Sequence, residues 1–215
     1  MVLPIAVVNT HKPGISSLVW KEGPSCEEDE DVIIVSHRHS STLLIYSLGQ
    51  STCSLIKSLH TIQPNAEGNT SIVCLPNHSI IAGSSMGMLR LWDTNPTSSS
   101  KPCWEIFSDT QSTRSANNAI VSITLLEPST FLSITRAAVV SIFCLTSLAV
   151  KSFGLTKAPT LIIRCALTLP YNSHLLRASL SPRKDFMLLT TSDERIYFYN
   201  IENGTWSICF TYHWF

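Results

Sequence analysis

The stretch that determines the predicted fold of this chain is Gly83-Ser84-Ser85-Met86-Gly87-Met88-Leu89-Arg90-Leu91-Trp92-Asp93. Its first five residues have the G-x-S-x-G spacing of a serine-hydrolase nucleophile. Its last six residues alternate as a β-strand does and end in Trp-Asp. The same segment therefore fits either the catalytic centre of an enzyme or one strand of a non-catalytic β-sheet protein.

The residues around Ser85 favour a hairpin over a catalytic centre. A serine nucleophile of this class lies on a sharp turn between a strand and a helix, which places its hydroxyl beside backbone N–H donors. A strand is expected at 79–82, but the alternation over 88–92 predicts a second strand in place of the helix. Asp109 and His174 follow in the order of that enzyme class, an order that most chains of this length offer by chance. We expect no catalytic residue, and we interpret the glycines as hairpin residues that tolerate positive φ.

The composition argues against two functional classes. The 215 residues suffice for one domain with a sizeable core. Lys and Arg total 15 and Asp and Glu total 15, so the net charge is zero, whereas a nucleic-acid-binding surface needs a basic excess. Hydrophobic residues make up 44% of the chain, but no apolar run reaches the ~18 residues that suggest a membrane-spanning helix. We therefore expect neither nucleic-acid binding nor a membrane span.

The cysteine spacing and the amino-terminal segment predict whether the chain binds a metal or cofactor and in which compartment it is found. None of the seven cysteines forms a C-x-x-C pair, so we expect no metal site, no cofactor and mostly buried free thiols. Residues 1–8 are apolar but lack the basic residues of a secretion signal, and we interpret them as a strand. These features predict a cytoplasmic protein, a nuclear protein, or one found in both compartments.

Short runs of β-branched, aliphatic and aromatic residues recur in a fixed order, separated by Ser, Asn, Pro and Gly. Four of these runs end in an aromatic residue, at positions 46, 92, 143 and 199, which are 46, 51 and 56 residues apart. Two strands are expected before each run and one after it. In the third unit the strand after it is either 150–155 or 161–166. Four strands that recur four times are the layout of β-propeller blades.

The chain resembles the WD40 family of β-propellers. The closest match is the segment 83–93, in which Trp92 and Asp93 are the family's Trp-Asp pair. The second match is the segment 191–200, with Asp193 in a tight turn where the family usually has an Asp. The resemblance implies an all-β chain that forms one propeller domain over 1–215. Its four blades are expected at residues 15–60, 70–108, 119–167 and 174–212.

The strand count predicts an incomplete ring. Residues 2–8 would add a strand before the first blade, and in WD40 proteins such a strand commonly completes the last blade. Here the last blade has an outer strand of its own at 205–212, so one outer strand is left over. We therefore expect a partial propeller, as in a fragment or isoform of a longer protein. Its exposed strand edges would favour association with other chains.

Charged residues and histidines lie in the tight turns of three blades, and propeller rims present such turns on one face. We predict these residues as a candidate surface for binding a protein partner. They are His37, Arg38, His39, Arg136, Asp193, Glu194 and Arg195.

The resemblance implies a non-catalytic scaffold or adaptor that binds other proteins within a multiprotein complex. One alternative is a propeller subunit associated with chromatin or membrane trafficking. Another is a serine hydrolase that uses Gly83-Ser84-Ser85-Met86-Gly87. The acidic run at residues 27–31 is expected to be a solvated loop.

Overall fold

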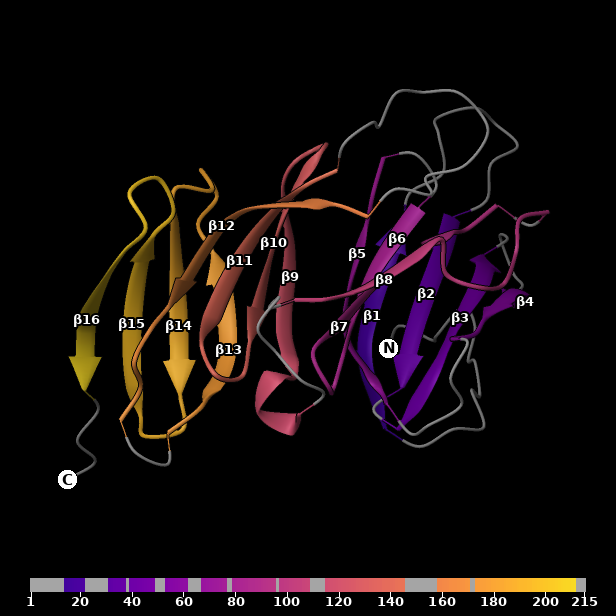
Figure 1. The fold of residues 1–215 in the computed structure, drawn as a ribbon. Helices are drawn as coiled ribbons and strands as arrows, with labels where there is room; N and C mark the ends of the chain where they lie inside the picture. The colour runs from indigo at the N-terminus through magenta and orange to yellow at the C-terminus, as the bar shows by residue number, and fades with distance from the viewer. Residues whose placement is uncertain are drawn as a thin grey trace, which may run out of the picture.

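The structure, a computed structural model, describes residues 14–21, 31–37, 39–48, 53–61, 67–76, 79–95, 97–108, 115–145, 158–170 and 173–211. These residues form sixteen β-strands and one 3-10 helix, η1 (Ala116–Asn118) (Figure 1). The first eight strands are β1 (Ile15–Lys21), β2 (Asp31–His37), β3 (Ser40–Leu48), β4 (Cys53–Leu59), β5 (Asn69–Cys74), β6 (Ser79–Ser84), β7 (Met88–Asp93) and β8 (Trp104–Phe107). The other eight are β9 (Ile120–Glu127), β10 (Thr130–Thr135), β11 (Val139–Cys144), β12 (Thr160–Ala166), β13 (Leu175–Leu180), β14 (Phe186–Thr191), β15 (Arg195–Asn200) and β16 (Thr205–Thr211).

The strands pair into four antiparallel sheets, each built from four strands that follow one another in the chain. We call these sheets blade 1 (β1–β4), blade 2 (β5–β8), blade 3 (β9–β12) and blade 4 (β13–β16). Each strand pairs with the next one along the chain, as expected of antiparallel strands joined by short connections. The expected all-β layout of four four-stranded blades is confirmed.

The third strand of each blade carries the aromatic residue that the sequence repeat predicted. These residues are Tyr46 on β3, Trp92 on β7, Phe143 on β11 and Tyr199 on β15, and all four are buried. The last strand of blade 3 is β12, so the 161–166 alternative was correct. The alternative at 150–155 and the additional strand expected at 2–8 lie outside the described residues.

In blade 2, alternate residues of each inner strand pack against different neighbours, blade 1 on one face and blade 3 on the other. Every residue of β6 is buried, and Ile81 on β6 and Leu91 on β7 contribute to the core shared with blade 3. Ile80 and Trp92 contribute to the core shared with blade 1. Alternate side chains of a strand point to opposite faces, so both faces of an inner blade must be apolar.

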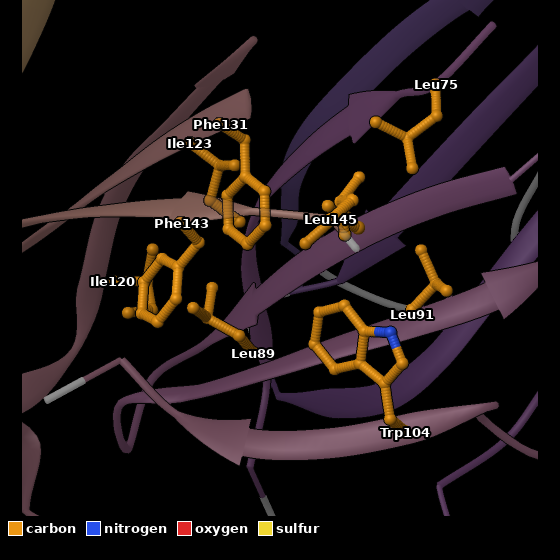
Figure 2. Packing of buried hydrophobic residues seen from close by; sticks show 10 residues of the cluster. Leu75, Leu89, Leu91, Trp104, Ile120, Ile123, Phe131, Phe143 and Leu145 are labelled. Atoms are coloured by element: carbon orange, nitrogen blue, oxygen red, sulfur yellow. The ribbon is translucent and has the colours of Figure 1, made fainter. Parts of the chain in front are cut away.

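Buried side chains fill the space between blades 2 and 3 (Figure 2). Between blades 2 and 3 the rings of Phe131 and Phe143 stack with centroids 5.1 Å apart, and Leu89 and Ile120 pack in the same cluster. A second cluster joins blades 3 and 4, and a third joins blades 1 and 2. Burial of these apolar faces is the main force that stacks the blades.

Lys57 on β4 of blade 1 reaches across to the connection between β7 and β8 of blade 2. Its Nζ donates hydrogen bonds to the carbonyl of Asn95 (2.5 Å) and to the carbonyl (2.9 Å) and Oγ (2.7 Å) of Ser98. Burial lowers the pKa of Lys57, and the nearby Asp93 opposes this effect. A buried ammonium needs such a set of acceptors, so Lys57 ties blades 1 and 2 together.

The blades follow one another in a row, and the ring is not closed (Figure 1). The first strand of each blade contacts the first strand of the next: β1 contacts β5, β5 contacts β9, and β9 contacts β13. Among the described residues no comparable contact joins β13 to β1. Blades 1 and 4 stand at opposite ends of the row, as expected for an incomplete propeller.

Six cysteines fall within the described residues, and five of them form no disulfide: Cys53, Cys74, Cys103, Cys144 and Cys165. They are half-buried, so the expectation of mostly buried thiols was wrong for this part of the chain. Cys103 lies just before β8, the outer strand of blade 2. Burial is the main cause that raises the pKa of its thiol above the usual value.

Candidate functional site

In blades 2, 3 and 4 the second and third strands are joined by equivalent tight turns. In each turn the N–H of the fourth residue donates to the carbonyl of the first. That fourth residue has positive φ in all three blades: Gly87 (87°), Ala138 (59°) and Glu194 (61°). Positive φ is unfavourable for residues with a Cβ, so it costs conformational energy at Ala138 and Glu194 but little at Gly87, which has no side chain.

A hydroxyl at the first position stabilises each of these turns. Oγ of Ser84 accepts a hydrogen bond from the backbone N–H four residues later (3.0 Å), and Oγ1 of Thr135 does the same (3.1 Å). Oγ1 of Thr191 instead shares its single proton between the carbonyl four residues later (3.1 Å) and the carboxylate of Asp193. Ser and Thr commonly form such local bonds in turns. Sequence reasoning missed this repeat, although a Ser or Thr precedes each turn and was visible as a signal.

The turns lie on one rim of the molecule. Those of blades 1 and 3 contact the start of the next blade, and the turn of blade 4 contacts the start of its own blade. Nδ2 of Asn69, at the start of β5, donates to the carbonyl of Ser40 in the turn of blade 1 (3.5 Å). The N–H of Leu175, at the start of β13, donates to the carbonyl of Arg136 in the turn of blade 3 (2.9 Å). We call this edge the hairpin rim. The described residues of its turns are 37, 39–40, 84–88, 135–139 and 191–195.

Arg136 and His174 join blades 3 and 4 at the hairpin rim. Nη2 of Arg136 lies 2.9 Å from Nε2 of His174. A guanidinium has no acceptor, so in this contact Arg136 donates and Nε2 of His174 accepts. The backbone N–H of His174 donates to Oγ of Ser192 in the turn of blade 4 (3.0 Å). One hydrogen-bonded chain thus connects the turns of the two blades.

Asp193 is the acceptor at the centre of the blade 4 turn. Its Oδ1 accepts hydrogen bonds from Oγ1 of Thr191 (2.5 Å) and Oγ of Ser173 (2.8 Å). Its Oδ2 lies 3.3 Å from Nε of Arg195. Burial would raise the pKa of Asp193, but the bonds from Thr191 and Ser173 and the charge of Arg195 outweigh it and lower that pKa. The fold therefore favours the ionised carboxylate.

Replacement of Asp193 by Asn is expected to flatten the acid dependence of stability. Because folding lowers the pKa of Asp193, its contribution is fully present above about pH 4 and is lost as the pH falls through the folded-state value. Wild type should lose about 1 kcal/mol more than Asp193→Asn between pH 6 and pH 3. Urea unfolding at both pH values measures this, with the exposed Glu202→Gln as a charge-matched control. An equal loss in wild type and Asp193→Asn would contradict the prediction.

The predicted partner-binding residues fall into two separate groups. Arg136, Asp193 and Arg195 lie together at the joint of blades 3 and 4, with Glu194 exposed beside them. His39 is exposed in the turn of blade 1, at the other end of the row (Figure 1). The role of these residues in binding stays a prediction.

His37 and Arg38 complete the predicted set. The expectation of an exposed turn residue was wrong for His37, which is the last residue of β2 and only 1% exposed. His37 is therefore buried at the end of β2, and its ring is not part of the surface of the hairpin rim. Arg38 lies outside the described residues.

Trp92 and Asp93 have unequal structural roles. The Trp92 side chain is 0% exposed and lies in the core between blades 1 and 2. Asp93 is partly exposed at the end of β7, where its Oδ1 accepts a hydrogen bond from the N–H of Asn95 (2.9 Å). The tryptophan side chain therefore packs between blades 1 and 2 and stabilises their contact. The aspartate side chain stabilises one turn through a hydrogen bond.

The surroundings of Ser85 are those of a β-hairpin. Ser85 lies in the turn between β6 and β7, and the segment after it is a strand. The helix that a nucleophile elbow requires is not formed there. His174 lies in the joint of blades 3 and 4, bonded to Arg136, and Asp109 lies outside the described residues. Of the motif glycines only Gly87 is in the turn, so the hairpin interpretation was wrong for Gly83, which lies within β6.

No group of three or more His, Cys, Asp or Glu side chains suited to a metal ion occurs in the described part of the chain. The same ranges contain no helix that is long and apolar enough to cross a membrane.

No protein-family model and no curated protein sequence matches this chain. Among solved structures it is similar to the β-propeller domain of Cps50 (Swd1) from Myceliophteria thermophila, with a TM-score of 0.63. The fold is a β-propeller. The two sequences are 12% identical, so this similarity shows the fold alone. The match covers 82% of this chain and 55% of the other, so this propeller spans about half the length of its neighbour.

Proposed function

We propose that this propeller is a WD40-like scaffold that binds another protein through the hairpin rim at blades 3 and 4 and performs no chemistry itself. The observation that carries the proposal is the hydrogen-bonded chain through Arg136, His174 and Ser192, beside the Asp193–Arg195 pair. It holds charged and polar groups of both signs in fixed positions on one edge of a rigid fold.

Fixed side chains favour recognition because binding does not have to order them. Immobilising a flexible side chain at an interface costs about 0.5–1.5 kcal/mol, and mutual hydrogen bonds reduce that cost here. Groups of both signs also discriminate against partners whose charges do not match. Turns carried on a rigid sheet scaffold are frequent binding sites in proteins generally. These features support a protein partner with complementary polar groups.

The replacement Arg136→Ala should weaken partner capture about fivefold or more, the loss expected for an interface residue that contributes 1 kcal/mol or more. The measurement is affinity purification of the tagged full chain followed by quantitative mass spectrometry. The matched control is Arg183→Ala, because Arg183 is exposed in the turn between β13 and β14, away from the hairpin rim. Thermal unfolding of both variants verifies that they are folded.

Equal capture by wild type and Arg136→Ala would exclude the rim at blades 3 and 4 as the contact surface. A parallel variant, His39→Ala, tests the exposed residue at the blade 1 end of the rim. The identity of the captured proteins also separates a general scaffold from the alternative of a chromatin- or membrane-trafficking subunit. Their compartments test the proposed cytoplasmic or nuclear location.

A further inference from the structure

The turn between β15 and β16 contains the only Asn-Gly sequence of the chain, Asn203-Gly204. It lies at the end of blade 4 opposite the hairpin rim (Figure 1). The Asn203 side chain is exposed, and Gly204 has a positive φ of 67°. Because glycine has no Cβ, its backbone nitrogen can approach the side-chain carbonyl carbon, Cγ, of the preceding asparagine with little steric hindrance. A nucleophile and an electrophile are therefore neighbours in one exposed turn.

Two hydrogen bonds polarise the side-chain carbonyl of Asn203. Its Oδ1 accepts from the backbone N–H of Thr205 (3.1 Å) and from Oγ1 of Thr205 (2.5 Å). Both donors make Cγ more electrophilic, and both stabilise the negative charge that develops on Oδ1 when a nucleophile attacks. The fold of the turn thus activates Asn203 beyond what its sequence alone provides.

One hydrogen bond of the turn opposes attack by the Gly204 nitrogen. The N–H of Gly204 donates to the carbonyl of Asn200 (3.0 Å), and this bond has to open before the nitrogen can lose its proton. Opening of one exposed turn costs much less free energy than unfolding of the whole chain. This hydrogen bond therefore slows the attack without preventing it.

We propose that Asn203 is a site of spontaneous deamidation in the folded protein. The Gly204 nitrogen gives its proton to a hydroxide ion and attacks Cγ of Asn203, so that an N–Cγ bond forms. The Cγ–Nδ2 bond then breaks, and Nδ2 takes a proton from water and leaves as ammonia. Water opens the cyclic imide that results, which gives aspartate by hydrolysis at Cγ or isoaspartate by hydrolysis at the backbone carbonyl. Water is the only co-reactant consumed, and no atom is oxidised or reduced.

The isoaspartate product is expected to weaken the contact between blades 3 and 4. The carbonyl of Gly204 accepts a hydrogen bond from Sγ of Cys165 on β12 (3.5 Å), and Nε1 of Trp206 donates to the same sulfur (3.1 Å). The Trp206 ring packs on Tyr199 with centroids 4.3 Å apart. Isoaspartate adds one carbon to the backbone just before Gly204, which displaces this carbonyl from Cys165. The turn therefore connects a slow chemical change to the outer part of a blade interface.

The proposal is tested by incubation of the folded full chain at physiological temperature, at neutral pH and at one pH unit above it. Mass spectrometry of proteolytic peptides should show conversion of Asn203, faster at the higher pH because the attacking nitrogen must lose a proton. Isoaspartate-specific enzymatic methylation identifies that product. Asn117 is the internal control, because it is exposed but is followed by Asn118, whose side chain hinders the nitrogen. Asn117 should stay unmodified.

The variant Thr205→Val tests whether the turn activates Asn203. It keeps the shape of the side chain but removes the Oγ1 donor, and the reaction should slow about tenfold, the effect of one hydrogen bond to a charged group. The variant Thr205→Ser keeps the hydroxyl and should react as wild type does. Circular dichroism verifies that both variants are folded.

Urea unfolding of fresh and aged samples tests the effect on the blade interface. Aged wild type should contain a less stable fraction that grows with the isoaspartate content. The variant Asn203→Asp has the charge of the other product on an ordinary backbone, and it should unfold as fresh wild type does. Equal stability of fresh and isoaspartate-containing samples would exclude an effect on the contact of Gly204 with Cys165.

Three outcomes would overturn the proposed site. The first is an unmodified Asn203 in the folded chain under conditions that modify it in the urea-unfolded chain, since the folded turn would then protect it. The second is a Thr205→Val variant that reacts as fast as wild type or faster. The third is equal modification of Asn117. The proposed binding at the hairpin rim is independent of these results, because it rests on different residues and on Arg136→Ala.

Discussion

The replacement Gly83→Ala is expected to cost about 3 kcal/mol of the free energy of unfolding. A Cβ at position 83 would lie 2.5 Å from both Cβ and Cγ2 of Ile120 and 2.8 Å from its Cγ1. Ile120 is buried on β9 in the core between blades 2 and 3, so its side chain has no room to move aside. Gly83 is needed because two blades approach closely there.

The matched control for this prediction is Gly204→Ala. The nearest atom to a Cβ there is the Tyr199 hydroxyl oxygen at 3.9 Å, so no overlap results. Its φ of 67° makes the alanine cost about 1 kcal/mol through backbone strain alone. Urea unfolding followed by tryptophan fluorescence compares the two variants. A loss at Gly83 no larger than the loss at Gly204 would mean that blades 2 and 3 are not packed this closely.

The replacement Trp92→Ala is expected to destabilise the chain by about 3–5 kcal/mol, the usual cost of truncating a buried large aromatic residue. Its indole is fully buried among apolar side chains of blades 1 and 2, including Ile34 and Ile45. Removal of the ring leaves a cavity at this interface that the rigid sheets cannot close. The measurement is again the free energy of unfolding in urea.

The neighbouring Asp93→Ala provides the contrast, with an expected loss of about 1 kcal/mol or less. Asp93 is partly exposed, its hydrogen bond to the N–H of Asn95 supports the turn after β7, and its charge lies near the Lys57 ammonium. Comparable losses in the two variants would show that the Trp-Asp pair acts as a unit. The structure instead assigns nearly all of its stabilising effect to the tryptophan.

The strands were predictable because their signal is local. Alternation over 88–92 and the aromatic residues at 46, 92, 143 and 199 placed the third strand of every blade correctly. The turn at Asp193 was predicted from the resemblance of the segment 191–200 to WD40 proteins, which usually have an Asp in that turn. These features depend on residues within a few positions of one another.

The candidate site was only partly predictable. Arg136 and the 191–195 turn were identified, but their connection through His174 was not, because those residues meet only when blade 4 packs on blade 3. His37 was expected at the surface because it lies at the expected turn of blade 1, yet it ends a buried strand. Burial depends on neighbouring elements, which a local pattern does not specify.

Local patterning therefore specifies the four antiparallel sheets, since a period of two residues produces a strand with two distinct faces wherever the chain adopts it. Which face meets which neighbour is decided by contacts between residues far apart in the chain. Gly83 beside Ile120 and Arg136 beside His174 are such contacts. The exposure of Leu188 on blade 4 belongs to the same class, because an exposed residue differs from a covered one only in what packs against it.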